Sequence, residues 1–257
     1  MKRPLKELGS LDGRWVVITG GAGHLGRAMA GAVLQSGASI VLLDRDEAAL
    51  KDAAAALRED GEGRIEIESV DLESGAARKA FAEALLARHP VDVLVNNAGF
   101  VGDSQLGGWA VPFAQQSIAT WRRALEVNLT APFHLSQLLS PSLGREGAGS
   151  IINISSIYGL LGPNMALYEG TEMGNPAAYA ASKGGLIQLT RWLATTLAPK
   201  IRVNSVSPGG IARNQPDSFV ARYEALTPLA RMGAEEDFAG IIAFLASDLS
   251  AWVTGQN

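Results

Sequence analysis

The sequence contains no cysteine, and this absence excludes disulfide bonds, thiolate metal sites and a cysteine nucleophile. It has no excess of basic residues, because 22 Lys and Arg against 26 Asp and Glu leave a formal net charge of −4. That balance argues against nucleic-acid binding. It also lacks an apolar run of the roughly 18 to 20 residues that a membrane-spanning helix needs. No set of His, Asp and Glu has metal-ligand spacing, so we expect no metal, nucleic acid or membrane partner.

The length and the N-terminus predict a single cytoplasmic domain. A chain of 257 residues fits one large α/β domain, and 47% hydrophobic with 19% charged residues excludes wholesale disorder. The first seven residues are charged and no apolar core follows them, which is unlike a secretory signal. We therefore expect residues 1–257 to form one domain in the cytoplasm.

Short apolar segments alternate with helical ones along the whole chain. The predicted strands are residues 15–19, 39–43, 65–70, 91–95, 150–154 and 201–206. The predicted helices are residues 25–36, 47–60, 76–88, 120–139, 177–198 and 235–247. This alternation predicts the α/β class, with a doubly wound parallel sheet of the Rossmann type. Long loops remain at about 100–118, 157–176 and 210–228, and such loops are usually functional.

A glycine-rich turn joins the first predicted strand to the first predicted helix. Within Thr19–Gly26, the residues Gly21, Gly23 and Gly26 match the pattern G-x-G-x-x-G. Glycines allow a tight turn and close approach of the backbone to a pyrophosphate, which the helix N-terminus then attracts. The alternative is a glycine-rich turn without a ligand.

Asp44 ends the second predicted strand, 18 residues after Gly26. An acidic residue at about this distance binds the hydroxyls of the adenosine ribose and repels a 2′-phosphate, so NAD is favoured over NADP. Arg45 opposes this conclusion, because a guanidinium binds phosphate well. The other interpretation of Asp44 is an N-cap for the helix that begins at Glu47.

Further motifs complete a family pattern. They are Asn96-Asn97-Ala98-Gly99, Val127-Asn128-Leu129, Ser155-Ser156, Tyr179-Ala-Ala-Ser-Lys183 and Ser207-Pro208-Gly209. Together with the glycine turn, this set closely resembles the short-chain dehydrogenase/reductase family over residues 11–257. The resemblance implies an oxidoreductase that transfers a hydride between NAD(H) and a secondary alcohol or ketone, with NADP less favoured as cofactor. The cofactor-binding residues that we expect are Gly20, Gly23, His24, Leu25, Gly26, Asp44, Asp71, Leu72, Asn97, Ala98, Gly99, Tyr179, Lys183, Pro208, Gly209 and Ile211.

Four residues carry the expected catalysis. Tyr179 and Lys183 are four apart on one helix and share a face, and a nearby ammonium favours the phenolate. Tyr179 is therefore the expected general acid/base. By resemblance, Lys183 also binds the nicotinamide ribose, Ser156 polarises the substrate oxygen, and Asn128 anchors a water in a proton relay. The alternative for Tyr179 and Lys183 is an ordinary pair on a helix surface.

The sequence departs from the family pattern in several places. His24 replaces a glycine of the turn, where it either donates to phosphate or faces solvent. Ser156 and Tyr179 are 23 residues apart, farther than is usual, and the extra segment suits a lid or a pocket wall. The alternatives are an oligomer contact and a passive loop. Arg213 replaces a common threonine and either binds an anionic substrate group or pairs with a lid carboxylate such as Glu172. Six strands are visible, and the usual seventh is apparently cut off.

The expected substrate contacts are Ser156, Tyr158, Tyr168 and Arg213. Residues 175–179 and 207–216 resemble oxidoreductases of bacterial surface-sugar modification, and Arg213 suits an anion, so an anionic sugar derivative is the expected substrate. The alternatives are a 3-oxoacyl thioester (acyl carrier protein) reductase and an NAD-binding regulator without catalysis. By resemblance we also expect a homodimer or homotetramer.

Overall fold

The computed structural model describes residues 3–101 and 106–257. In these residues six strands form one parallel sheet in the order β3-β2-β1-β4-β5-β6. The strands are β1 (Trp15–Thr19), β2 (Ser39–Asp44), β3 (Ile65–Ser69), β4 (Val93–Asn96), β5 (Gly149–Ile154) and β6 (Ile201–Val206). This order confirms the doubly wound Rossmann sheet. From β1 the chain adds strands toward β3 on one side, and from β4 it adds them toward β6 on the other. Such sheets bind ligands at the carboxyl ends of the strands where this order changes, which here is between β1 and β4.

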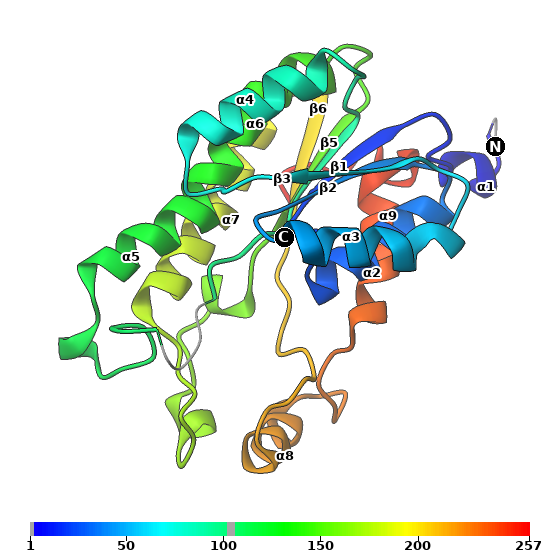
Figure 1. Cartoon of the computed structure of the whole chain (residues 1–257). Helices are drawn as coiled ribbons and strands as arrows, with labels where there is room; N and C mark the ends of the chain where they lie inside the picture. The colour runs from blue at the N-terminus through cyan, green and yellow to red at the C-terminus, as the bar shows by residue number, and fades with distance from the viewer. Residues whose placement is uncertain (1–2, 102–105) are drawn as a thin grey trace.

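Helices cover both faces of the sheet (Figure 1). The α-helices are α1 (Leu5–Leu8), α2 (His24–Gln35), α3 (Glu47–Ala56), α4 (Gly75–Leu86), α5 (Ile118–Leu125), α6 (Ala131–Leu143), α7 (Ala177–Leu197), α8 (Asp217–Leu226) and α9 (Ala239–Ala246). Val16 and Ile18 of β1 pack into the core with α2, α3 and α9, while Trp15 and Val17 pack with α4, α6 and α7. The alternation follows from the two-residue period of a strand.

Three predicted helices differ from those observed. The predicted helix 47–60 ends at Ala56 and is followed by a 3₁₀ turn (Leu57–Glu59). In place of the predicted helix 120–139, the structure has a longer helical stretch that begins at Ile118 and ends at Leu143. It is interrupted, because a π-helix (Glu126–Thr130) separates α5 from α6. The last predicted helix begins as a 3₁₀ turn (Glu235–Phe238) before α9. The loop 210–228 contains α8, and the loop 157–176 contains the 3₁₀ turns Ile157–Gly159 and Met165–Tyr168.

The C-terminal residues lie along the outer edge of β6. The backbone N–H of Gly255 donates to the Val203 carbonyl at 2.8 Å, and Ser205 N–H donates to the Gln256 carbonyl at 2.8 Å. None of the helices within the described ranges is both long and apolar enough to cross a bilayer. The same residues hold no group of three or more acidic or histidine side chains placed to bind a metal ion.

Candidate active site

The glycine turn has the geometry of an anion cradle. Gly20 has φ +65°, and a Cβ on it would meet the Ala98 backbone at 2.9 Å. A Cβ on Gly26 would overlap the carbonyl oxygen of Gly20, so α2 can approach the turn only with glycine there. Among the residues that the structure describes, no side chain caps the N-terminus of α2, and no acidic residue lies in its first turn. Its N–H groups therefore fit a pyrophosphate.

Asn97 and Thr19 brace this turn against β4. The Thr19 hydroxyl oxygen accepts the backbone N–H groups of Asn97 and Ala98, both at 3.0 Å. The Asn97 amide donates to the carbonyls of Thr19 (3.0 Å) and Gly20 (3.1 Å). The sheet edge and the turn are thus held together before any ligand binds.

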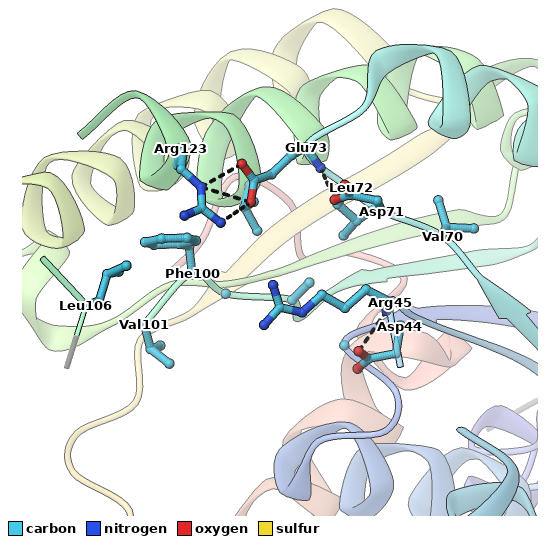
Figure 2. Close-up of a pocket in the computed structure, with 14 residues that line it drawn as sticks. Asp44, Arg45, Val70, Asp71, Leu72, Glu73, Phe100, Val101, Leu106 and Arg123 are labelled. Atoms are coloured by element: carbon cyan, nitrogen blue, oxygen red, sulfur yellow. Dashed lines mark hydrogen bonds and ion pairs between the residues drawn. The ribbon is translucent and has the colours of Figure 1, made fainter. Parts of the chain in front are cut away.

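An adjacent cavity of about 620 Å³ suits the adenosine half of a dinucleotide. It is lined by the predicted residues Gly20, Asp44, Asp71, Leu72, Ala98 and Gly99. Asp44 is not the N-cap of α3, because Asp46 accepts the Ala49 N–H at 3.0 Å in that role. Asp44 Oδ1 accepts the N–H of Arg45 at 2.8 Å, and the Arg45 side chain also lines the cavity (Figure 2).

Part of this cavity wall was not predicted from the sequence. Glu73, Phe100, Leu106, Arg123 and Val127 line it as well. They come from the β3–α4 connection, the 100–118 loop and the α5 region, so no short spacing marks them as one site. Residues 102–105 of that loop lie outside the described residues.

A second cavity, of about 190 Å³, brings the catalytic candidates together. Ser156, Tyr179 and Lys183 all line it. So do Leu25, Asn97, Gly99, Pro208, Gly209 and Ile211, which the sequence assigned to the cofactor. Gly99 and Val101 line both cavities, so the two adjoin at the carboxyl ends of the central strands.

Burial controls the charges of Tyr179 and Lys183. Lys183 is 3% exposed. Its ammonium donates to the Ile154 carbonyl at 2.8 Å, and burial lowers its pKa to about 8. It lies 5.8 Å from the centre of the Tyr179 ring. Burial raises the pKa of Tyr179 above its usual value, while a hydrogen bond with Ser156 acts in the opposite direction. Burial therefore favours the protonated hydroxyl of Tyr179, whereas the sequence predicted that the nearby ammonium favours the phenolate.

Asn128 lies behind this cavity and does not line it. The residue is fully buried in the π-helix, an element that often occurs at functional sites. Its Oδ1 accepts the Phe100 N–H at 2.6 Å, and its Nδ2 donates to the Ser182 hydroxyl at 3.0 Å. The described contacts make it a positioning residue, and the proton relay implied by the resemblance stays a prediction.

His24 and Arg213 converge on one carboxylate. Glu235 Oε1 lies 3.3 Å from the Arg213 guanidinium and 3.9 Å from His24 Nδ1. Arg213 therefore forms an ion pair, as one alternative predicted, but with Glu235 and not with Glu172. Neither His24 nor Arg213 lines the two cavities described above, and their ligand-binding roles stay predictions.

The loops 157–176 and 210–228 pack together into a unit that we call the substrate cap. Arg222 on α8 donates to the carbonyls of Ala166 and Leu167, both at 3.0 Å, and of Glu169 at 2.8 Å. The hydroxyls of Tyr158 and Tyr168 are hydrogen-bonded at 2.8 Å. Burial, this hydrogen bond and the other nearby tyrosines raise the pKa of Tyr158, so its hydroxyl stays neutral.

Comparison with known proteins decides the family. A family model described as "Enoyl-(Acyl carrier protein) reductase" matches residues 20–257. The chain is 33% identical over 255 residues to galactitol 2-dehydrogenase (L-tagatose-forming) of Cereibacter sphaeroides, covering 95% of this chain and 92% of that protein. The chain belongs to the short-chain dehydrogenase/reductase family. It is also 34% identical over 254 residues to a 3-oxoacyl-[acyl-carrier-protein] reductase of Thermotoga maritima, covering 96% and 95%.

Two solved structures extend the comparison to cofactors. NAD⁺-bound xylitol dehydrogenase has a TM-score of 0.84 and 29% identity, with 96% of each chain covered. A putative NAD(P)-dependent gluconate 5-dehydrogenase from Beutenbergia cavernae, solved with bound NADP, has a TM-score of 0.85 and 34% identity, with 97% and 95% covered. As a short-chain dehydrogenase/reductase, the protein is an oxidoreductase that uses a nicotinamide cofactor. A regulator without catalysis gains no support from these relatives.

Proposed function

We propose that this short-chain dehydrogenase/reductase uses NAD(H) to interconvert a secondary alcohol and a ketone on an anionic sugar derivative. The observation that carries the proposal is the cavity in which Ser156, Tyr179 and Lys183 meet, directly beside the adenosine cavity that Asp44 lines. A reacting group held at the junction of the two cavities has an acid/base, a hydrogen-bond donor and a cation within one small volume.

Each residue in the cavity has a distinct task in this proposal. The bound cofactor supplies or accepts the hydride. Tyr179 exchanges the proton of the substrate hydroxyl, and the Ser156 hydroxyl hydrogen-bonds the substrate oxygen. Lys183 holds a positive charge close to the Tyr179 ring, which favours the phenolate when the proton leaves. Asn128 keeps the backbone around Phe100 and Ser182 in place.

Asp44 supports NAD in preference to NADP. Its carboxylate lies at the end of β2 and lines the adenosine cavity, where it repels a 2′-phosphate. Arg45 is exposed and lines the same cavity, so it acts in the opposite direction. We give Asp44 the larger weight because one of its oxygens is already oriented by the Arg45 N–H.

The substrate cap supports a polar substrate. The chain has four tyrosines, and Tyr158, Tyr168 and Tyr223 belong to the cap while Tyr179 lies in the catalytic cavity. The hydroxyls of Tyr158 and Tyr168, which are hydrogen-bonded to each other, are suitable partners for a polyhydroxylated molecule. Arg213 would bind the anionic group by exchanging its 3.3 Å ion pair with Glu235 for a pair with the substrate.

A 3-oxoacyl thioester is the second candidate substrate. It is favoured by three exposed apolar side chains on the substrate cap, Leu160, Leu161 and Met165, which are 52%, 67% and 56% exposed. An acyl chain would cover them. The experiment below separates the two candidates.

A substrate panel tests the proposal. Sugar phosphates, sugar acids, neutral polyols and 3-hydroxyacyl thioesters would each be assayed with NAD⁺ and with NADP⁺. We expect the highest kcat/KM with an anionic sugar derivative and NAD⁺. Arg213→Gln should lower kcat/KM for that substrate by about tenfold or more, since a charged hydrogen bond contributes about 1.5–3 kcal/mol. A neutral polyol should be affected much less. Highest activity with an acyl thioester and NADP⁺ would contradict the proposal and support the second candidate.

We also propose that the protein is a cytoplasmic homodimer or homotetramer associated through α6 and α7. Phe133 on α6 and Trp192 on α7 are 41% and 56% exposed, and large apolar side chains of this kind are typical of interfaces. Light scattering after size exclusion should give a multiple of 26.9 kDa, with Trp192→Glu shifting it toward the monomer. A single 26.9 kDa species in the wild type would contradict the assembly.

A further inference from the structure

An ion pair closes the outer wall of the adenosine cavity. The Arg123 guanidinium on α5 contacts both carboxylate oxygens of Glu73, with Nε–Oε2 at 2.8 Å and Nη2–Oε1 at 2.7 Å. Figure 2 shows the pair on the side of the cavity opposite Asp44. Glu73 directly follows Asp71 and Leu72, and its N–H donates to Asp71 Oδ1 at 2.9 Å. Both charged side chains line the cavity.

Phe100 connects this ion pair to Asn128. The Arg123 guanidinium lies over the Phe100 ring, 4.9 Å from its centre, and the Phe100 and Trp109 rings form a T-shaped pair with their centres 5.2 Å apart. The Phe100 backbone is hydrogen-bonded twice to the Asn128 amide, at 2.6 Å through its N–H and at 3.3 Å through its carbonyl. A shift of Phe100 that moves its backbone would therefore disturb the buried Asn128 side chain.

Asn128 in turn contacts the catalytic helix. Its Nδ2 donates to the Ser182 hydroxyl at 3.0 Å, and Ser182 donates to the Tyr179 carbonyl at 2.8 Å. A continuous series of contacts thus runs from the wall of the adenosine cavity to the residue that is proposed to move the proton. Asn128 and Ser182, the two residues of this series nearest to Tyr179, are fully buried, so their side chains have little freedom to rearrange.

The ion pair contributes too little stability to explain the arrangement. The side chains of Arg123 and Glu73 are 44% and 28% exposed, and pairs of this kind contribute about 0–1 kcal/mol to folding. Their bidentate geometry instead fixes the plane of the guanidinium. A fixed guanidinium plane at the mouth of a nucleotide cavity stacks well on an aromatic base.

We propose that Arg123, oriented by Glu73, is a cofactor-binding residue that contacts the adenine base and positions Phe100 and Asn128 when the base is bound. The inference concerns the adenosine half of the cofactor, so it applies to either nicotinamide dinucleotide. Arg123 contacts the cofactor, whereas Glu73 and Phe100 act through other groups and are positioning residues.

Binding measurements with Arg123→Gln test the contact. Arg122→Gln is the matched control, because it makes the same change at the neighbouring exposed position on α5. By calorimetry, Arg123→Gln should bind NAD⁺ and ADP-ribose about 5- to 20-fold more weakly, the range expected for a partly desolvated guanidinium on an aromatic ring. Nicotinamide mononucleotide, which lacks adenine, should compete with NAD⁺ equally well in the wild type, in Arg123→Gln and in Arg122→Gln. The thermal midpoint should change little.

The positioning role has a separate readout. At saturating dinucleotide, Arg123→Gln and Phe100→Leu should both lower kcat several-fold. Only Arg123→Gln should also weaken the binding of ADP-ribose. Unchanged ADP-ribose affinity in Arg123→Gln, or an equal loss in Arg122→Gln, would overturn the contact. Equal weakening of nicotinamide mononucleotide would overturn it too. Wild-type protein that binds neither dinucleotide would overturn this inference together with the cofactor assignment, so the two failures are distinguishable.

Discussion

Replacing Tyr179 by phenylalanine should lower kcat by about 10²- to 10⁴-fold, the range for loss of a positioned general acid or base. The substitution removes one hydroxyl from a cavity that also holds Ser156 and Lys183, and it leaves the aromatic ring in place. Stopped-flow and steady-state absorbance of NADH would measure the loss.

Cofactor binding is the control for this variant. Tyr179→Phe should bind ADP-ribose like the wild type, because the adenosine cavity does not include Tyr179. Tyr223→Phe offers a comparison within the substrate cap, where the hydroxyl accepts the Gly210 N–H at 2.5 Å, and we expect a much smaller loss of kcat. A Tyr179→Phe enzyme that keeps more than a tenth of wild-type kcat would contradict its role as acid/base.

Replacing Lys183 by methionine should abolish most activity and raise the stability of the fold at neutral pH. The ammonium is almost fully buried, and in the described residues its hydrogen bond is to the Ile154 carbonyl, with no acidic partner. Burial of an ammonium costs folding free energy, and methionine has a similar shape without the charge. A pKa lowered from 10.5 to about 8 corresponds to a few kcal/mol, since one pKa unit is about 1.4 kcal/mol.

The pH dependence of this difference follows from proton linkage. Below pH 8 both folded and unfolded Lys183 carry the proton, so the folded state bears the full cost of burial. Between about pH 8 and 10.5 the folded protein releases the proton while the unfolded chain retains it, and stability rises with pH. Lys183→Met lacks this rise. The gap between the two thermal midpoints should therefore be largest near pH 7 and should narrow toward pH 10.

Parallel stability curves for the two proteins across that pH range would contradict the assignment of a buried, charged Lys183. Other titrating groups are common to both proteins and cancel in the difference.

Activity would distinguish the functional role, because a residue that only destabilised the fold would be dispensable for turnover. We expect kcat of Lys183→Met to fall by at least about 10²-fold, through loss of the cation beside Tyr179.

The arrangement of the sheet could be predicted because its signals are local. The strands β1 and β6 occur at the residues where apolar, β-branched runs predicted them. Helix α8 lies in the stretch 210–228, which was predicted to be a loop, and it begins directly after Pro216. The π-helix at Glu126–Thr130 was also missed, since a π-helix has no distinct side-chain pattern.

The sequence by itself determined the glycine turn, the acidic residue at the end of β2, and the shared helix face of Tyr179 and Lys183. Each of these depends on residues a few positions apart, or on the order of strand and helix, which local backbone geometry controls. Only the tertiary structure decided which distant groups pair. These pairs are the ion pair of Arg213 with Glu235, the ion pair of Arg123 with Glu73, 50 positions apart, and the hydrogen bond from Phe100 to Asn128. Such pairs depend on how whole helices pack against the sheet, and that packing buries apolar surface without regard to sequence separation.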